Sequence, residues 1–90
     1  MKKEISDNEI DETIKQLLNY GDGKSVHLLN TAAFHISAYK LLRSIKPHKL
    51  KEDDIKFFEK EYKLITVWLK SKKHEDYKAL KDFTYTRDYV

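Results

Sequence analysis

The feature that most constrains the fold is a run of fifteen residues, Ser25 to Tyr39, that contains no Asp, Glu, Lys or Arg. Elsewhere the chain is strongly charged, since charged residues make up 37% of its 90 residues. The run is too short, and too rich in His, Asn, Thr and Ser, to span a membrane. We therefore expect it to form a helix buried inside a small soluble bundle.

One proline and two glycines divide the chain into a few long segments. Pro47 predicts a turn over residues 46–49, and Gly21 is a natural stop for a first helix. The sequence contains no internal repeat and no long linker. We predict an all-α fold, a small three- to four-helix up-and-down bundle, with a single domain over residues 1–83 and a tail over residues 84–90.

The first helix is predicted by a specific capping pattern. Ser6 is a typical N-cap and Glu9 stands at the capping-box position three residues later. Ile5 and Ile10 flank the cap with the spacing of a hydrophobic staple.

A second helix is expected over residues 25–45, with apolar side chains pointing in nearly every direction. Only Asn30, Ser37 and Ser44 form a polar line, which we assign to solvent. Such a helix needs neighbours on about three sides.

A third helix is expected to open at residues 50–54 and to end near the lysines of 70–73. Its apolar residues form two stripes about 120° apart. The first stripe is Ile55, Phe58, Tyr62, Ile65 and Leu69, and the second is Phe57, Leu64 and Trp68. A short fourth helix is expected over 75–83, and the tail that follows is either extended or a continuation of that helix.

These helices have more apolar surface than the chain can cover by folding alone, which indicates a partner. We predict a non-enzymatic protein-interaction module, a small regulator or inhibitor of bacterial, plasmid or phage type. Its partner is expected to be another protein or a second copy, with a homodimer favoured. The predicted contact residues are Phe34, Leu41, Ile45, Phe57, Leu64 and Trp68, together with Tyr85 and Tyr89 of the tail.

A basic cluster supports an alternative function. Residues 40–51 contain five cations and no acid, and lysines of this kind can contact the phosphates of nucleic acids. The alternative is therefore a small nucleic-acid-binding regulator that uses Lys40, Arg43, Lys46, Lys49 and Lys51.

A further alternative rests on two residues. The spacing of Arg43 and His48 is similar to the Arg-x4-6-His motif of the HEPN ribonucleases, helical bundles that cleave RNA at a dimer interface. That resemblance implies RNA cleavage by this pair. Pro47 interrupts the segment, and the other interpretation is a cation at a helix end beside an exposed turn histidine.

The sequence lacks the residue patterns that metal and cofactor sites require. His27 and His35 are eight apart and point about 80° apart around a helix, so we expect no metal site. We also expect no cofactor, no small-molecule ligand and no membrane contact. The absence of cysteine and of an apolar N-terminal run leads us to expect a cytoplasmic protein.

Overall fold

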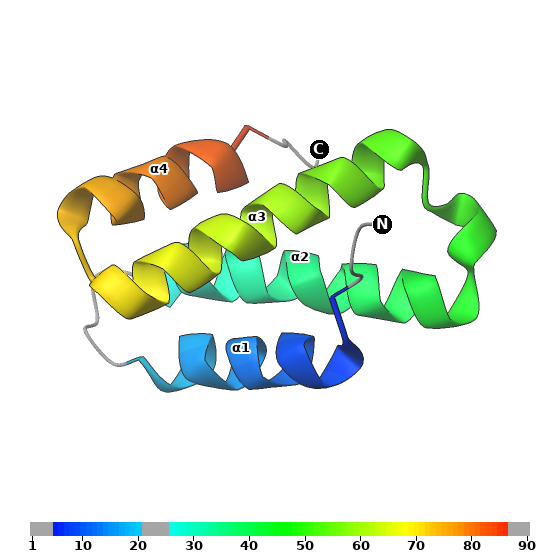
Figure 1. Cartoon of the computed structure of the whole chain (residues 1–90), viewed down its shortest axis with the longest axis horizontal. Helices are drawn as coiled ribbons and strands as arrows, with labels where there is room; N and C mark the ends of the chain where they lie inside the picture. The colour runs from blue at the N-terminus through cyan, green and yellow to red at the C-terminus, as the bar shows by residue number, and fades with distance from the viewer. Residues whose placement is uncertain (1–4, 21–25, 87–90) are drawn as a thin grey trace.

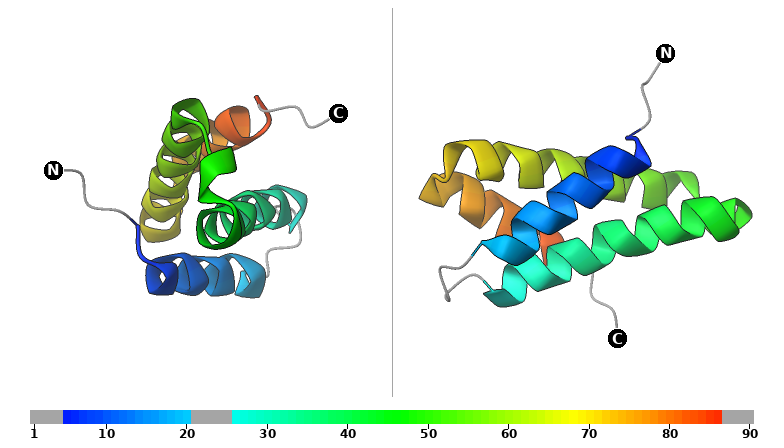
Figure 2. Two further views of the ribbon diagram at one scale, coloured as in Figure 1. Left: turned by 90° about the vertical axis from the view of Figure 1, so that its right-hand side faces the viewer. Right: turned by 90° about the horizontal axis from the view of Figure 1, so that it is seen from below.

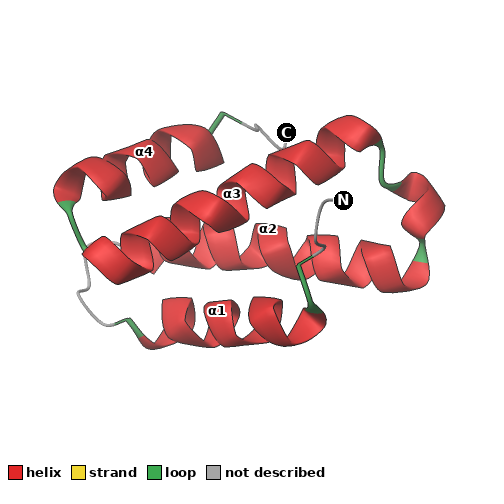
Figure 3. Ribbon diagram, viewed as in Figure 1, coloured by secondary structure: helices red, strands yellow, loops and turns green. Residues whose placement is uncertain are grey.

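The computed structural model describes residues 5–20 and 26–86. In this part of the chain, helix is the sole regular secondary structure (Figure 3). The elements are α1 (Asp7–Asn19), α2 (Val26–Ile45), the short 3-10 helix η1 (Pro47–Lys49), α3 (Glu52–Ser71) and α4 (His74–Thr84). The predicted small all-α bundle is confirmed.

Successive helices run in opposite directions, as an up-and-down bundle requires (Figure 1). Helix α1 packs mainly on α2, and α4 packs mainly on α3 from the other side of the bundle (Figure 2). Because α1 and α4 are short, the end of the bundle formed by α2, η1 and α3 extends beyond both of them (Figure 1).

The start of α1 follows the predicted capping pattern in part. The Ser6 hydroxyl accepts a hydrogen bond from the backbone N–H of Glu9 at 3.1 Å, so Ser6 is the N-cap. The Glu9 carboxylate accepts from the Ser6 hydroxyl at 3.2 Å, whereas a full capping box would use the Ser6 backbone N–H. The predicted stop at Gly21 and start at Ser25 lie outside the described residues.

All four helices contribute to one core. Its buried apolar residues are Ile10 and Leu17 of α1, Leu28, Leu29, Ala32, Ala33, Ile36 and Tyr39 of α2, Phe58, Ile65 and Trp68 of α3, and Leu80 of α4. The polar line of Asn30, Ser37 and Ser44 is exposed, as expected. The small residues Ala32 and Ala33 lie on the buried side of α2, where close helix packing needs them.

The fourth helix extends one residue beyond its expected end. Thr84 belongs to α4 and is fully buried. The backbone N–H of Tyr85 then donates to the Lys81 carbonyl and that of Thr86 to the Phe83 carbonyl, so residues 85–86 form a turn that closes the helix. Residues 87–90 of the predicted tail lie outside the described residues.

Candidate protein-binding surface

The exposed side of α2 is uncharged along its whole described length. Its exposed residues fall within an arc of about 100° around the helix axis. We call these residues the α2 outer face: His27, Asn30, Phe34, Ser37, Leu41, Ser44 and Ile45. None of them is Asp, Glu, Lys or Arg, although such residues are frequent in the rest of the chain.

Three large apolar side chains stand on this face. Phe34, Leu41 and Ile45 are 67%, 58% and 62% exposed, which is unusual for residues of this size when they are grouped. Their exposure agrees with the surface expected from the sequence, and their role in binding stays a prediction. Leu18 on α1 is equally exposed, at 59%, but every other exposed residue of α1 is polar.

The apolar residues of α2's exposed side form a row along the helix. Ala38 is half-buried at the edge of the α2 outer face and lies between Phe34 and Leu41 along the axis, and Ile45 continues the row one turn further. Because Ala38 is small, another backbone can approach closely at the middle of the row.

An aromatic pair extends the surface at the N-terminal end of α2. The ring of Tyr85 stacks on that of His27, with centroids 5.9 Å apart and planes at 18°. Tyr85 remains 41% exposed, as its predicted role as a contact residue requires. Tyr89, the other aromatic residue predicted for the tail, lies outside the described residues.

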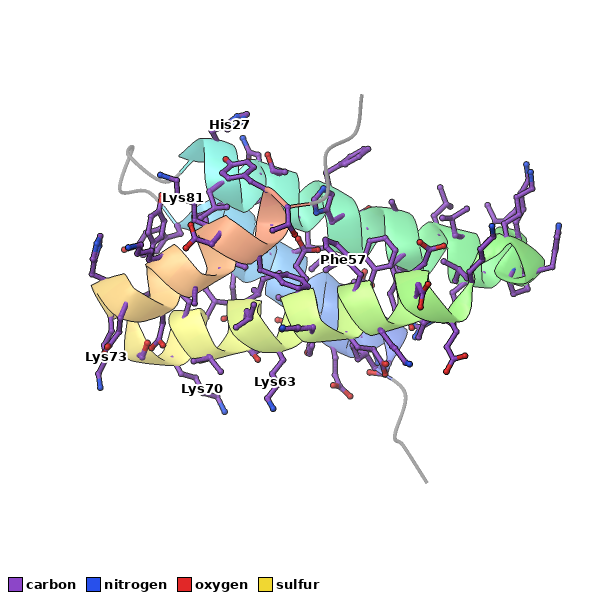
Figure 4. All side chains as sticks on the ribbon, turned by 90° about the horizontal axis from the view of Figure 1, so that it is seen from above. His27, Phe57, Lys63, Lys70, Lys73 and Lys81 are labelled. Carbon is purple, nitrogen blue, oxygen red and sulfur yellow. The ribbon has the colours of Figure 1, made fainter. Side chains whose placement is uncertain are left out.

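The second predicted contact stripe lies mostly inside the bundle. Trp68 is only 3% exposed and packs edge-on against Tyr20, with ring centroids 4.9 Å apart. Phe57 is half-buried and stacks on Phe83 of α4 at 4.8 Å (Figure 4). Leu64 is half-buried and packs against the same core. This stripe is covered by α4 and α1, so Trp68 is not available to a partner and the stripe offers little free surface.

Two cations of the predicted basic cluster pair with acids of α1. The Lys40 ammonium donates to Asp11 Oδ1 at 2.6 Å. The Arg43 guanidinium donates to Asp7 Oδ1 and to the Ile5 carbonyl, each at 2.6 Å. These bonds hold α1 against α2, and they leave less positive charge for phosphates.

The environment of Arg43 stabilises its charge. Burial tends to lower the pKa of Arg43, but hydrogen bonds to the Asp7 carboxylate and the Tyr39 hydroxyl outweigh this effect, so the pKa of Arg43 is raised above its ordinary value. The guanidinium also lies 5.0 Å from the centre of the Tyr39 ring.

The remaining residues of the cluster lie on and around η1. Lys46, Lys49 and Lys51 are exposed, and so is His48. The guanidinium of Arg43 points toward α1, where Asp7 and Ile5 hold it, while His48 belongs to η1 beyond the end of α2. Nucleic-acid binding by the cluster and RNA cleavage by the pair of Arg43 and His48 stay predictions.

A buried polar cluster that the sequence did not reveal joins three helices. The Nδ1 atom of His35 (α2) lies 2.7 Å from Glu61 Oε2 (α3), and the Thr84 hydroxyl (α4) donates to the same oxygen at 3.0 Å. All three side chains are almost completely buried. Because no solvent or substrate reaches them, the cluster joins the helices and does not form an accessible reactive site.

An open groove of about 560 Å³ runs between α1 and α3, lined largely by polar side chains such as Glu12, Gln16 and Lys70. No group of three or more His, Cys, Asp or Glu side chains in residues 5–20 and 26–86 is arranged to hold a metal ion. Within the same residues, the helices are too short or too polar to cross a lipid bilayer.

Comparison of the chain with protein-family models, with curated proteins and with solved structures gave no match.

Proposed function

We propose that this chain is a non-enzymatic protein-interaction module whose α2 outer face binds a protein partner, either another protein or a second copy of the chain. The single observation that carries the proposal is the combination, on one exposed helix side, of three large apolar residues and no formal charge. A role as a small regulator or inhibitor fits such a surface, because binding alone then changes the activity of the partner.

The energetics of desolvation support this face over the others. Burial of a charged side chain at an interface without a partner is unfavourable, because the charge loses its hydration. Burial of an apolar side chain is favourable. Burial of Phe34, Leu41 and Ile45 releases water from apolar surface and leaves no charged group without a partner. Asn30, Ser37 and Ser44, which lie beside them, can keep hydrogen bonds to water at the rim.

The cellular setting is part of the proposal. A chain without cysteine suits a reducing compartment such as the cytoplasm, where a surface of this kind meets its partner.

Site-specific photocrosslinking tests the proposal. A benzoylphenylalanine in place of Phe34 keeps a large apolar group on the α2 outer face, and the same residue in place of Leu18 is the matched control, because the two positions are 67% and 59% exposed. On irradiation of cells that produce the chain, we expect protein adducts of defined mass from position 34 and none from position 18. Equal adduct formation at both positions, or none at position 34, would contradict the proposal.

A further inference from the structure

We infer that the α2 outer face is covered by a second copy of this chain, with the two α2 helices packed antiparallel about a two-fold axis. The inference rests on the proposed function, and it adds the identity and the orientation of the partner. It is based on the spacing, the charge and the area of the apolar row Phe34, Ala38, Leu41 and Ile45.

The spacing of this row is that of a helix-pairing seam. Its members are four, three and four residues apart, and this alternation of four and three keeps apolar side chains on one side of a helix, as in the seam between paired helices. The inward stripe of α3 has the same alternation of three and four over Ile55, Phe58, Tyr62 and Ile65. Of these residues, Ile55, Phe58 and Ile65 pack in or against the core of the bundle. The row on α2 has no such neighbour in the described residues, since Phe34, Leu41 and Ile45 are exposed.

The row is also a palindrome, which is the property that an antiparallel pair of identical helices needs. A two-fold axis midway between residues 39 and 40 places Phe34 opposite the second copy's Ile45. The same axis places Ala38 opposite the second copy's Leu41. The dimer then contains this contact between a small and a large side chain twice. A single face therefore satisfies both copies with the same contacts.

Charge selects which surface of the second copy fits. The exposed side of α3 carries Lys56, Lys60 and Lys63, so packing it on the α2 outer face would desolvate ammonium groups against a surface that offers them no acid. The matching α2 face brings no formal charge to the contact. Two copies that meet through α2 thus avoid the burial of charged groups at the contact.

The area predicts a weak dimer. Three large side chains that are each about 60% exposed offer on the order of 300 Å² of apolar surface per copy, since one aromatic side chain alone buries ~150–250 Å². Stable interfaces bury roughly 800 Å² per partner, and transient ones bury less. We expect a dissociation constant on the order of 10–100 µM.

Sedimentation equilibrium of the full chain tests the partner. Between about 10 µM and 1 mM, the expected average mass rises from the monomer value of 10.8 kDa toward twice that value. Leu41→Lys should weaken association at least tenfold, because it buries two ammonium groups near the axis. Leu18→Lys is the matched control, with an equally exposed leucine near the end of its helix, and should leave the dissociation constant unchanged. Circular dichroism establishes that both variants fold.

Disulfide trapping tests the orientation. Because the chain has no native cysteine, disulfides form only at the introduced positions. Phe34→Cys and Ile45→Cys chains are mixed and oxidised, and intact masses distinguish the products. The antiparallel pair predicts mainly the mixed disulfide, because residues 34 of the two copies are then separated by about 16 Å along the axis, beyond the reach of a disulfide. A parallel pair would give self-disulfides, and that result would overturn the antiparallel arrangement.

The two proposals fail in different ways. A chain that stays monomeric to 1 mM overturns the second-copy inference, and photocrosslinks from position 34 to a different protein would then still support the proposed function. A dimer that is insensitive to Leu41→Lys overturns the inference as well, because its interface would lie elsewhere.

Discussion

Helices α2 and α3 have the same length, 20 residues each, but their exposed sides differ in charge. Six of the eight exposed residues of α3 are charged: Glu52, Asp53, Lys56, Lys60, Lys63 and Lys70. Lys63 and Lys70 project from α3 on the side away from α2 (Figure 4). The α2 outer face has no charge, and its three large apolar residues lie open.

The difference separates two tasks that a helix in a small bundle performs. Both helices use an inward face to build the core, and these faces meet at the pair of His35 and Glu61. The lysines of α3 keep its outer side hydrated and discourage association. The outer side of α2 lacks that protection, which is why we assign binding to it. Inward substitutions should therefore change folding, and outward substitutions on α2 should change association.

The largest expected effect is on folding and comes from the buried pair. His35→Ala and Glu61→Ala should each lower the free energy of unfolding by about 3 kcal/mol, because each removes one side of the buried hydrogen bond between α2 and α3. Urea unfolding followed by circular dichroism measures the change. Lys63→Ala, on the exposed side of the same helix, should stay within about 0.5 kcal/mol of the parent. A loss below about 1 kcal/mol in both inward variants would show that the pair contributes little.

A double variant sharpens this prediction. His35→Ala with Glu61→Ala removes both polar groups, so neither side chain remains to lose the other as a hydrogen-bond partner. We expect it to lose clearly less stability than the sum of the two alanine variants. Strict additivity would mean that the two side chains act independently, despite their separation of 2.7 Å.

The second largest effect is on association, when α2 is given the charge pattern of α3. Ser37→Lys with Ser44→Lys keeps every apolar residue of the α2 outer face and adds only charge. The dissociation constant of the dimer should rise about tenfold, with unfolding unchanged within about 0.5 kcal/mol. Gln16→Lys with Asn19→Lys adds the same charge on exposed α1 positions and should have little effect. If both pairs weaken association equally, net charge and not the face controls it.

A smaller effect is expected at the ion pairs that hold α1 on α2. A double-mutant cycle with Asp7→Asn and Arg43→Gln should give a coupling energy below about 1 kcal/mol, because the Asp7 carboxylate is largely exposed to solvent. The coupling should fall further in high salt. Denaturant unfolding of the four chains measures it, and a coupling of several kcal/mol would show that this contact anchors α1 far more strongly than a surface pair can.

The smallest expected effect is that of salt on the dimer. Since the α2 outer face contributes no charge, the dissociation constant should change less than about threefold between 50 and 500 mM NaCl. A protein that contacts several phosphates loses about a thousandfold or more in affinity over a comparable range. Steep salt dependence of binding to DNA or RNA would favour the alternative based on Lys46, Lys49 and Lys51.

Local signals in the sequence are sufficient to predict most of the fold. The Ser6 cap, the break at Pro47 and the solvent line of Asn30, Ser37 and Ser44 each depend on residues close together in the chain, and all three are found in the structure. Local physics determines where a helix begins and which of its sides is polar.

The parts that sequence reasoning misses depend on distant residues. Periodicity identifies the stripe of Phe57, Leu64 and Trp68 but not the helix that covers it, because that depends on how α4 folds back. Nothing near Glu61 in the sequence indicates that it is buried, because its partner His35 is 26 residues away. The bond between Arg43 and Asp7, which spans 36 residues, likewise leaves no local signal in the sequence.

The most direct test of the central claim, that the uncharged side of α2 is the binding side, is a dilution series followed by nuclear magnetic resonance. Backbone amide signals of the full chain are compared between about 20 µM and 1 mM. We predict concentration-dependent shifts at Asn30, Phe34, Ser37, Leu41 and Ile45, and none at Lys56, Lys60 or Lys63. Shifts that gather on the outer side of α3 while those of α2 stay fixed would contradict the account.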